Sequence, residues 1–561
     1  MRDGEVVAHC EEERLNRVRH APGYFPSGAM NFCLNEGGLT IEDIDYVVVP
    51  FQGAKYVNGY MQRFFESVHA RYEVDERTLA WERSLKNWFA PDAVQGRIYV
   101  QLRRMYGDRC FPLLRMVNHH FAHAVPAFFG SPFEEALIIT VDGSGEENAT
   151  VVWHGRGSQI TMLRQYTIPH SLGWFYSAFT EYLGFEAYDG EYKVMGLAAY
   201  GQWDDELKAK LDQVLRITRP GEYEVNPYFL FYGPHSYSER FTDALVHHLG
   251  HKPRSQKEEI ANWHEKLAYA VQQRLEEVML EIVRYHTEKT GIRRLCLSGG
   301  VALNVKMNGR LYSSGLLDDI FIHPLCSDAG QVIGGPMAHY HECVQLEGRS
   351  WRPATLQHVY LGPGYKDEEI EATLLGCGVR YEACEDISDR AADLLAQGKI
   401  VGWFQGRMES GPRALGNRSI LADPREKAAQ DRVNTAIKYR EYWRPFCPSL
   451  NLEAVSEYLT KPTRCPFMIL TFNVSEDIAR RIRAVVHVDN TVRPQEVSKD
   501  VNPRYHRLIE AFARRTGVPV VLNTSFNVKG EPIVCKPTDA LRTFFATGLD
   551  ALAIGNCLVQ K

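Results

Sequence analysis

Two histidines four residues apart, His119 and His123, have the spacing of a metal-binding pair. They lie in the apolar stretch VNHHFAHAVPAFF, which predicts a short helix over His119–Phe129. Because side chains at i and i+4 stack on one face of a helix, both imidazoles can reach the same ion. A polar pair satisfied in a core or at the surface has the same spacing, so the pair by itself leaves that alternative open.

A carboxylate follows the histidine pair. Ala136–Val141 is a β-branched and aliphatic run that predicts a strand, and it ends in Asp142-Gly143-Ser144-Gly145. Such a turn can bring a carboxylate and free backbone N–H groups to one place, although Asp-Gly is also an ordinary hairpin signal. Ala149–His154 is expected to complete the hairpin. Together with the histidines, Asp142 indicates a site for a borderline first-row metal.

Two strand-to-helix units lie downstream. Arg294–Ser298 predicts a strand that leads through a Gly-Gly pair into a helix with Asn304 and Asn308 at i, i+4. Nucleotide folds use this order to bring phosphate or ribose to a helix N-terminus, so both amides are candidates for ribose or adenine contacts. Helix capping and packing is the alternative. Asp319–His323 predicts the second strand, and Asp328 in the next turn stands where a further carboxylate ligand would be useful.

The segments between these groups predict scaffold. Ser255–Thr290 has one apolar face, a Ser255–Glu258 capping box and a stop at Gly291, which predict a long core helix. Gly190–Gly201 places Lys193 in a small-residue segment where backbone can approach a ligand closely. A solvated lysine in a Gly-rich loop is the alternative there.

The start of the chain predicts half of a hairpin. Asp3-Gly4 is a turn signal and Glu5–His9 reads as the strand after it, so we expect a first strand to be missing from this sequence. The glutamates of CEEERLNRVRH are expected to form a solvated face. Arg14, Arg17 and Arg19 can instead reach an anionic ligand.

The next segments predict structure without chemistry that can be named. Residues 27–45 predict a helix and an acidic loop, and Tyr46–Phe51 predicts a buried strand. Residues 55–110 are aromatic-rich and helical in pattern, as in a family-specific insertion.

The second half carries scattered cations. Polar residues 343–365, with Pro and Gly, indicate a domain boundary near 350, and strands are predicted over Gly398–Phe404 and Pro519–Leu522. Scattered arginines are often plain surface charge. Here they stand beside aromatic residues and Gly turns at strand ends, where ligand sites occur, and arginine forks suit phosphate or carboxylate. We predict phosphate binding from this set: Arg407, Arg413, Arg418, Lys438, Arg440, Arg444, His487 and Arg493.

The bulk composition is that of an ordinary globular protein of two to four domains. Of 561 residues, 45% are apolar and 24% are charged, and the net charge is −6. No long basic stripe is visible, so nucleic acid is not an expected partner. Twelve cysteines without a C-x-x-C pair fit a reducing cytoplasm. No apolar run reaches the ~18 residues of a membrane span, and no signal peptide pattern is found.

The motifs HHFAHA, VDGSGE, EYKVMGLAAYG, SGGVALN and SDAG, in this order, resemble the carbamoyltransferase family that includes the nodulation-factor and antibiotic O-carbamoyltransferases. GPRALGNRS, YREYWRPF, RPQ and NTSFN continue the resemblance over nearly the whole chain. It implies an α/β protein with an actin/sugar-kinase-like domain over residues 1–348, built of two ribonuclease-H-like halves and similar to the TsaD-like metal-binding subunit that makes threonylcarbamoyl-adenosine in tRNA. Residues 349–561 are implied to be a YrdC-like α/β domain, which forms the adenylate.

The resemblance further implies a two-step reaction. ATP with Mg²⁺ and carbamoyl phosphate would form carbamoyladenylate in the C-terminal domain. The carbamoyl group would then pass to a hydroxyl of a small-molecule or glycan acceptor in natural-product or polysaccharide biosynthesis. The implied ligands of iron(II), or of another divalent metal, are His119, His123, Asp142 and Asp328. The candidate cofactor-binding residues are Lys193, Asn304, Asn308, Arg413, Lys438, Arg444, Arg493 and Asn523, and the candidate catalytic residues are Asp142 and Arg19.

The start of this sequence departs from the family pattern. Family members begin with a strand that carries a His-Asp-x-Ser-like turn, and that histidine is thought to act as base on the acceptor hydroxyl. The segment is absent here, and Arg19 stands where some members have an anion-contacting lysine. We expect upstream in-frame codons to supply the strand, and the chain as given to bind ligands yet transfer poorly.

Two other functions stay open at this stage. One is a fused enzyme that makes threonylcarbamoyl-adenosine in tRNA, which the charge balance argues against. The other is a degenerate nucleotide- or metal-binding protein. The sequence also leaves open the acceptor, the metal and the oligomeric state, a dimer included.

Overall fold

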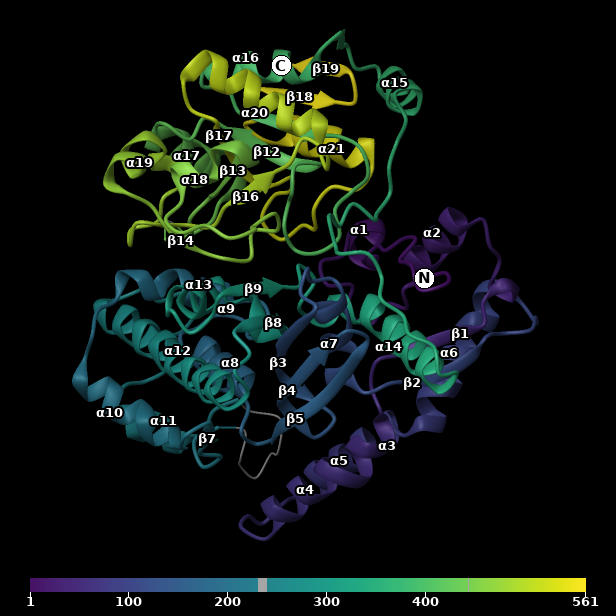
Figure 1. The fold of residues 1–561 in the computed structure, drawn as a ribbon, viewed down its shortest axis with the longest axis vertical. Coiled ribbons are helices and arrows are strands. Elements are labelled where there is room, and N and C mark those ends of the chain that lie inside the picture. The colour runs from purple at the N-terminus through teal and green to yellow at the C-terminus, as the bar shows by residue number, and fades with distance from the viewer. Residues whose placement is uncertain (231–239, 442) are drawn as a thin grey trace. The chain divides into compact units, whose positions relative to one another are not determined.

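The computed structural model describes residues 1–230, 240–441 and 443–561. They form two compact units: unit 1 comprises Met1–Val6 and Leu39–Thr355, and unit 2 comprises Val7–Gly38 and Leu356–Lys561. In Figure 1, unit 2 is green to yellow except for its purple N-terminal segment. The sequence predicted a break near 350 in a segment of Pro, Gly and polar residues. It did not predict that Val7–Gly38 would pack with the C-terminal residues.

A five-stranded sheet is the centre of unit 1. Its order is β5-β4-β3-β8-β9, in which the first three strands are antiparallel and the last three parallel. The predicted run Ala136–Val141 is buried along its whole length inside the sheet, as a strand with neighbours on both sides requires. The strand bounds are β3 Glu135–Gly145, β4 Asn148–Arg156, β5 Gln159–Thr167, β8 Arg294–Ser298 and β9 Asp319–Ile322.

Helices cover this sheet. The helix predicted over His119–Phe129 is α7, with those bounds, and it packs against β3 and α14 (Gln331–Leu346). The predicted long helix is α12 (Asn262–Thr290), which ends at Gly291 in the left-handed conformation, as predicted. The other helices of the unit are α8 Leu172–Tyr182, α9 Glu191–Leu197, η3 Ala198–Tyr200, α10 Asp205–Val214, α11 Asp243–Leu249, η4 Gly300–Leu303, α13 Val305–Ser313 and η5 Asp328–Gly330.

The predicted start of the long helix is wrong, and the loop that was the alternative around Lys193 does not form. Helix α12 begins at Asn262, and the predicted capping-box residues Ser255 and Glu258 lie before it. They are joined by hydrogen bonds from the Ser255 N–H to the Glu258 carboxylate (3.4 Å) and from the Glu258 N–H to the Ser255 carbonyl (3.1 Å). The Gly-bearing segment around Lys193 is helical over Glu191–Leu197, and α9 and η3 pack against α12.

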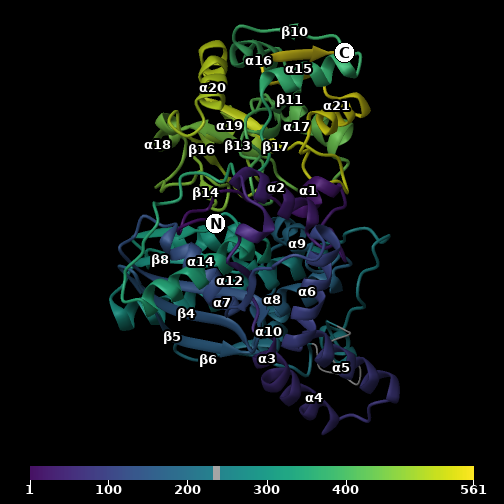
Figure 2. The same cartoon turned by 90° about the vertical axis from the view of Figure 1, so that its right-hand side faces the viewer.

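The first hundred or so residues of unit 1 form small elements, which include the segment predicted to be an insertion. Strands β1 (Tyr46–Val49) and β2 (Leu113–Met116) make a separate two-stranded parallel sheet, so β1 is only half-buried and the predicted buried strand is wrong in this respect. Helices fill the predicted insertion, and α4 and α5 lie away from the five-stranded sheet (Figures 1 and 2). The helices of the segment are η1 Ile41–Asp43, α3 Gly53–Lys55, η2 Tyr56–Met61, α4 Gln62–His69, α5 Glu76–Phe89 and α6 Pro91–Tyr106. Further along the chain, unit 1 also contains a hairpin of β6 (Leu215–Arg219) and β7 (Glu222–Val225).

The expected strand over Glu5–His9 does not form. Asp3-Gly4 is a turn, as predicted, and it is closed by a single antiparallel bridge between Arg2 and Glu5. A strand needs a hydrogen-bonded neighbour, and among the described residues the one backbone partner of His9 N–H is the carbonyl of Leu361 (3.2 Å).

Unit 2 is built on an eight-stranded sheet of order β10-β19-β18-β11-β12-β17-β13-β16. Helices α16 (Ile387–Ala396) and α20 (Pro503–Thr516) pack together over it, and their apolar faces, which include Tyr505 of α20, form one core with Trp403 of the sheet. The strands are β10 Glu382–Ala383, β11 Val401–Phe404, β12 Arg418–Ala422, β13 Cys447–Asn451, β16 Gln495–Val497, β17 Val520–Ser525, β18 Ala551–Ile554 and β19 Cys557–Gln560, and a small sheet pairs β14 Phe472–Asn473 with β15 Thr491–Val492.

The two strands predicted for the second half of the chain form in unit 2: Gly398–Phe404 corresponds to β11 and Pro519–Leu522 to β17. Helices α15 (Asp367–Gly376) and α16 (Ile387–Ala396) precede β11. The whole chain is therefore a mixed α/β protein, as predicted. The remaining helices are α1 Glu12–Asn16, α2 Ser27–Gly37, α17 Lys427–Val433, η6 Asn434–Lys438, η7 Leu452–Ala454, α18 Val455–Tyr458, α19 Glu476–Arg481, η8 Arg483–Val485, α20 Pro503–Thr516 and α21 Pro537–Ala546.

Candidate metal centre

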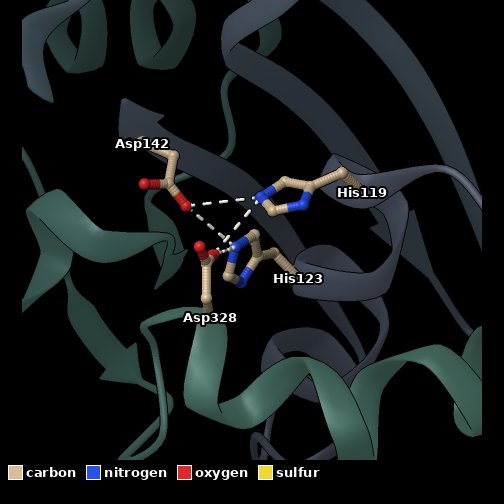
Figure 3. A group of neighbouring side chains, drawn as sticks. All are labelled: His119, His123, Asp142 and Asp328. Carbon is tan, nitrogen blue, oxygen red and sulfur yellow. Dashed lines mark hydrogen bonds and ion pairs between the residues drawn. The ribbon is translucent and has the colours of Figure 1, made fainter. Parts of the chain in front are cut away.

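Four side chains predicted as metal ligands converge in unit 1 (Figure 3). The Nε2 atom of His123 lies 3.0 Å from Oδ2 of Asp142, and that of His119 lies 3.5 Å from the same oxygen. Each Nε2 atom also lies 3.5 Å from Oδ1 of Asp328. One donor atom from each residue falls within 4.8 Å of all the others, so the four can face a single ion.

Three elements bring the ligands together. Helix α7 supplies both histidines from successive turns, with ring centroids 4.9 Å apart. Strand β3 supplies Asp142 at its end, where the Gly143 N–H holds the second carboxylate oxygen at 2.7 Å. The turn η5 supplies Asp328, and the loop before η5 is tied to the end of β8 because Gly299 N–H donates to the Cys326 carbonyl (2.8 Å).

Glycines next to the cluster make the close approach possible. Gly299 has φ +95°, and a Cβ there would overlap the backbone of Val141. A Cβ on Gly145 would overlap the ring of His119. The Gly-Gly and Asp-Gly-x-Gly signals in the sequence thus mark places where β8 and β3 must pack without side chains.

A buried carboxylate that the sequence analysis did not single out, Glu146, orients the start of α7. It is 1% exposed and accepts hydrogen bonds from the N–H of Gln52 (2.7 Å), Nδ2 of Asn118 (2.9 Å) and the N–H of His119 (3.1 Å). Asn118 in turn caps α7 through the N–H of Phe121 (2.9 Å). The sequence signal that could have identified Glu146 is its position directly after the predicted Asp-Gly-x-Gly turn.

The cluster concentrates charge in a buried place. Burial acts to raise the pKa of Asp142, but hydrogen bonds from His119 and His123 outweigh it and hold that pKa well below its usual value. Burial likewise acts to lower the pKa of His123, yet hydrogen bonds to Asp142 and Asp328 raise it to about 9. Ser298 lies 3.4 Å from Nδ1 of His123, on the side away from the cluster.

The donor set fits a divalent first-row metal. Two imidazole nitrogens and two carboxylate oxygens are the ligands that such ions accept in proteins. The side chains of His119, His123 and Asp142 are 8%, 2% and 14% exposed, whereas that of Asp328 is 73% exposed. Three of the four ligands are therefore mostly buried, and the site is exposed on the side of Asp328, where a substrate oxygen can approach.

The predicted nucleotide-binding residues of unit 1 have internal partners. Asn304 caps α13 through the N–H of Met307 (3.0 Å) and exchanges hydrogen bonds with Gln272, and Asn308 donates to the carbonyl of Ala302 (2.8 Å). Lys193 lies over the ring of Phe185, 5.6 Å from its centroid. The contacts of Asn304 and Asn308 are the capping and packing contacts that the sequence left open as an alternative for them, and the role of all three residues in ligand binding stays a prediction.

The arginines near the start of the chain belong to unit 2. Arg14 and Arg17 donate to backbone carbonyls of that unit, of Gly411 (2.8 Å) and of Pro532 (2.8 Å) and Ile533 (2.6 Å). The structure therefore shows both guanidinium groups bound to the protein backbone and not facing a site for an anionic ligand. Arg19 lies in the same segment, and its catalytic role stays a prediction.

A second group of predicted residues is assembled in unit 2 by β13 and β17. Asn523 on β17 is paired in register with Cys447 on β13, and its Nδ2 donates to the carbonyl of Ala414 (3.1 Å), next to Arg413. The guanidinium of Arg493 contacts Sγ of Cys447 at 2.8 and 3.1 Å. These contacts link three distant segments of the chain, and the sequence analysis did not single out Cys447.

Lys438 is a buried cation in the same unit. Its Nζ donates to Oδ1 of Asn527 (2.7 Å) and to Oγ of Ser525 (3.2 Å). Burial, and then the charges of Arg440 and Arg444, hold the pKa of Lys438 well below its usual value. Burial and Arg444 also lower the pKa of Arg440 to about 9. Cations that depress one another's pKa in this way form a site that an anion would stabilise.

The fold and these two sites define a two-unit α/β enzyme with a metal-type ligand cluster in one unit and a cationic site in the other. The chain belongs to the carbamoyltransferase family: the family model for the carbamoyltransferase N-terminus matches residues 1–337 and that for the carbamoyltransferase C-terminus matches residues 392–561. The protein is therefore a carbamoyltransferase. No described helix combines the length and the apolar character that a membrane crossing needs.

Relatives agree over most of the chain. It is 37% identical to the uncharacterized protein sll1178 of Synechocystis, covering 100% of this chain and 94% of that protein. It is also 37% identical to the nodulation protein NolNO of Sinorhizobium fredii, covering 100% and 78%. The 3'-hydroxymethylcephem-O-carbamoyltransferase of Streptomyces clavuligerus is 29% identical over 62% of this chain and 61% of its own. A solved full-length HypF structure aligns at 14% identity and TM-score 0.26 over 44% of this chain and 46% of its own, a score too low to carry an argument.

Proposed function

We propose that the protein is an O-carbamoyltransferase that forms carbamoyladenylate from carbamoyl phosphate and ATP in unit 2 and transfers the carbamoyl group to an acceptor hydroxyl in unit 1. The observation that carries the proposal is the convergence of His119, His123, Asp142 and Asp328 within 4.8 Å. The name of the cephem O-carbamoyltransferase relative supports transfer to a hydroxyl of a small molecule.

The cationic site of unit 2 would bind the phosphate groups of both substrates. Arg493 offers a fork for bidentate phosphate binding, and Arg413 and Lys438 stand on segments that Asn523 and Ser525 tie to β17. Carbamoyl phosphate would lose its phosphate with water, and the carbamate oxygen would displace pyrophosphate from ATP, whose Mg²⁺ neutralises the leaving group.

In unit 1, a bound iron(II) or other divalent metal would supply Lewis-acid polarisation of the carbamoyl carbonyl. His119, His123 and Asp142 would hold it on the buried side, and Asp328 would close the exposed side. Asn304 and Asn308 would bind the adenylate beside the Gly299-Gly300 turn, and Arg19 would contact an anionic group. A closed transfer between the two sites would limit hydrolysis of the mixed anhydride.

The strand order supports the finer fold assignment. In unit 1, three antiparallel strands followed by two parallel ones, in the order β5-β4-β3-β8-β9, agree with one ribonuclease-H-like half of an actin/sugar-kinase-like domain. The eight-stranded mixed sheet of unit 2 agrees with a YrdC-like domain. All twelve cysteines are free, which supports action in a reducing cytoplasm.

Pyrophosphate release and mass spectrometry test the first step. The protein is incubated with ATP, Mg²⁺ and carbamoyl phosphate, and the products are analysed for pyrophosphate and carbamoyladenylate. We expect both with the wild type and with His123→Ala, and neither with Arg493→Ala. ATP turnover that is independent of carbamoyl phosphate, or an Arg493→Ala variant as active as the wild type, would overturn the proposal.

A further inference from the structure

The start of the chain makes contacts with a loop some four hundred residues away, inside unit 2. The carboxylate of Glu11 accepts the N–H of Gly411 at 2.6 Å, and Nη2 of Arg14 donates to the carbonyl of the same glycine at 2.8 Å. The N–H and the carbonyl of Gly411 are thus both hydrogen-bonded to side chains of α1 and its N-cap residue. Gly411 has φ +95°, a conformation that leaves its peptide groups turned toward these partners.

These contacts are buried and charge-assisted. Arg14 is 3% exposed and lies 3.1 Å from Glu13 and 3.8 Å from Glu11. Burial acts to raise the pKa of Glu11, but Arg14, His9 and the Gly411 N–H outweigh it and lower that pKa. Glu11 is therefore held as a carboxylate, which accepts a shorter and stronger hydrogen bond than a neutral group.

Gly411 belongs to the loop that precedes β12. In this loop the fully buried Glu409 accepts the N–H groups of Leu415 (2.6 Å), Asn417 (3.3 Å) and Arg418 (3.2 Å), and the Ser410 N–H donates to the carbonyl of Val359 (2.7 Å). The contacts of Glu409 hold the second half of the loop. In the first half, Val359 holds Ser410, whereas Glu11 and Arg14 hold Gly411, two residues before Arg413.

A second loop of the cationic site is held by the same segment. Arg17 donates to the carbonyls of Pro532 and Ile533 and lies 3.7 Å from Asp539. Cys10 and Ala29 also pack with Met408 and Cys535 in one apolar cluster. The N-terminal segment therefore braces both loops that flank Asn523, the one before β12 and the one after β17.

We propose that Glu11 and Arg14 are positioning residues for Arg413: by fixing the two peptide groups of Gly411 they set the guanidinium two residues further along toward the phosphate of the substrate. This inference rests on the proposed carbamoyladenylate chemistry of unit 2. It also gives the acidic stretch CEEER a role other than that of a solvated face.

The test compares Glu11→Gln with the matched control Glu13→Gln. Both remove one carboxylate that pairs with Arg14, but Glu13 contacts the backbone of His20 and no residue of the loop among the contacts described. For Glu11→Gln we expect the KM for carbamoyl phosphate in pyrophosphate release to rise on the order of tenfold, with kcat changed much less, because a misplaced group costs binding of the phosphate. Glu13→Gln should match the wild type.

Hydrogen exchange of the loop amides supplies a readout that does not depend on activity. We expect faster exchange of residues 410–415 in Glu11→Gln and wild-type exchange in Glu13→Gln. Arg14→Lys, which keeps the charge but loses the guanidinium fork, carries the same test if Glu11→Gln does not fold. Equal KM and equal exchange in the two glutamine variants would overturn the inference. A wild type that releases no pyrophosphate would overturn the proposed function, and the exchange comparison would still decide whether the brace exists.

Discussion

Removal of the Glu146 carboxylate should loosen the metal centre without touching a ligand. In Glu146→Ala, three N–H donors lose their acceptor: the buried N–H of His119 and the part-buried N–H of Gln52 and Nδ2 of Asn118. A buried unsatisfied donor costs about 1–3 kcal/mol. Because the donors of Gln52 and Asn118 are only part-buried, water can offset part of this cost. We expect unit 1 to lose about 3 kcal/mol of stability in total, allowing for partial relaxation.

The same change should weaken metal binding, because His119 would no longer be held at the first turn of α7. Loss of a partner that orients a ligand typically weakens metal affinity by about 10–100-fold. Isothermal titration with Co²⁺, a redox-stable probe of the site, measures this, and thermal unfolding measures the stability. Glu147→Ala is the matched control, since the Glu147 side chain is 36% exposed and pairs with the exposed Arg63, which is worth about 0–1 kcal/mol.

Two outcomes would refute this reasoning. One is a Glu146→Ala variant whose Co²⁺ affinity and unfolding temperature equal those of Glu147→Ala. The other is a loss of stability with unchanged Co²⁺ affinity, which would show that the cluster does not depend on the backbone position of His119.

Three further predictions concern the two sites. His123→Ala should abolish Co²⁺ binding in titration yet keep pyrophosphate release, and a loss of both would contradict the separation of the sites. Arg493→Lys should raise the KM for carbamoyl phosphate by about tenfold or more, since lysine cannot form a bidentate fork; a KM equal to that of the wild type would argue against phosphate contact. The pKa of Lys438 is lowered by burial and by Arg440 and Arg444, so its charge is present below that lowered pKa and lost as pH rises through it. The KM for carbamoyl phosphate should therefore rise at alkaline pH in the wild type, and Lys438→Met should have a high KM at every pH; a pH-independent wild-type KM would contradict this.

Much of the metal centre could be predicted because its signals are local. The apolar helix pattern gave the bounds His119–Phe129, and the aliphatic run before Asp142 gave strand β3. Helix and strand periodicities depend on residues within one or two turns, so a single sequence is sufficient to locate them. The Gly signals around residues 143 and 299 were also correct as places of close packing, although only the structure shows against which backbone.

Predictions failed where packing against distant residues decides the outcome. Ser255 and Glu258 satisfy a capping rule, but α12 begins only at Asn262. Strand β1 has a buried composition, but its only partner among the described strands is β2, which leaves it half-exposed. The sequence also did not indicate that Arg14 and Arg17 would donate to backbone carbonyls of unit 2.

The sequence by itself determined which residues could bind a metal and on which local elements they stand, since side-chain type and short-range periodicity are written in consecutive residues. Only the tertiary structure decided that Asp328 reaches the histidines, that Glu146 is buried beneath them and that Val7–Gly38 joins unit 2. These outcomes depend on contacts between segments tens to hundreds of residues apart, whose free energy is set by burial and hydrogen-bond partners that no local pattern specifies.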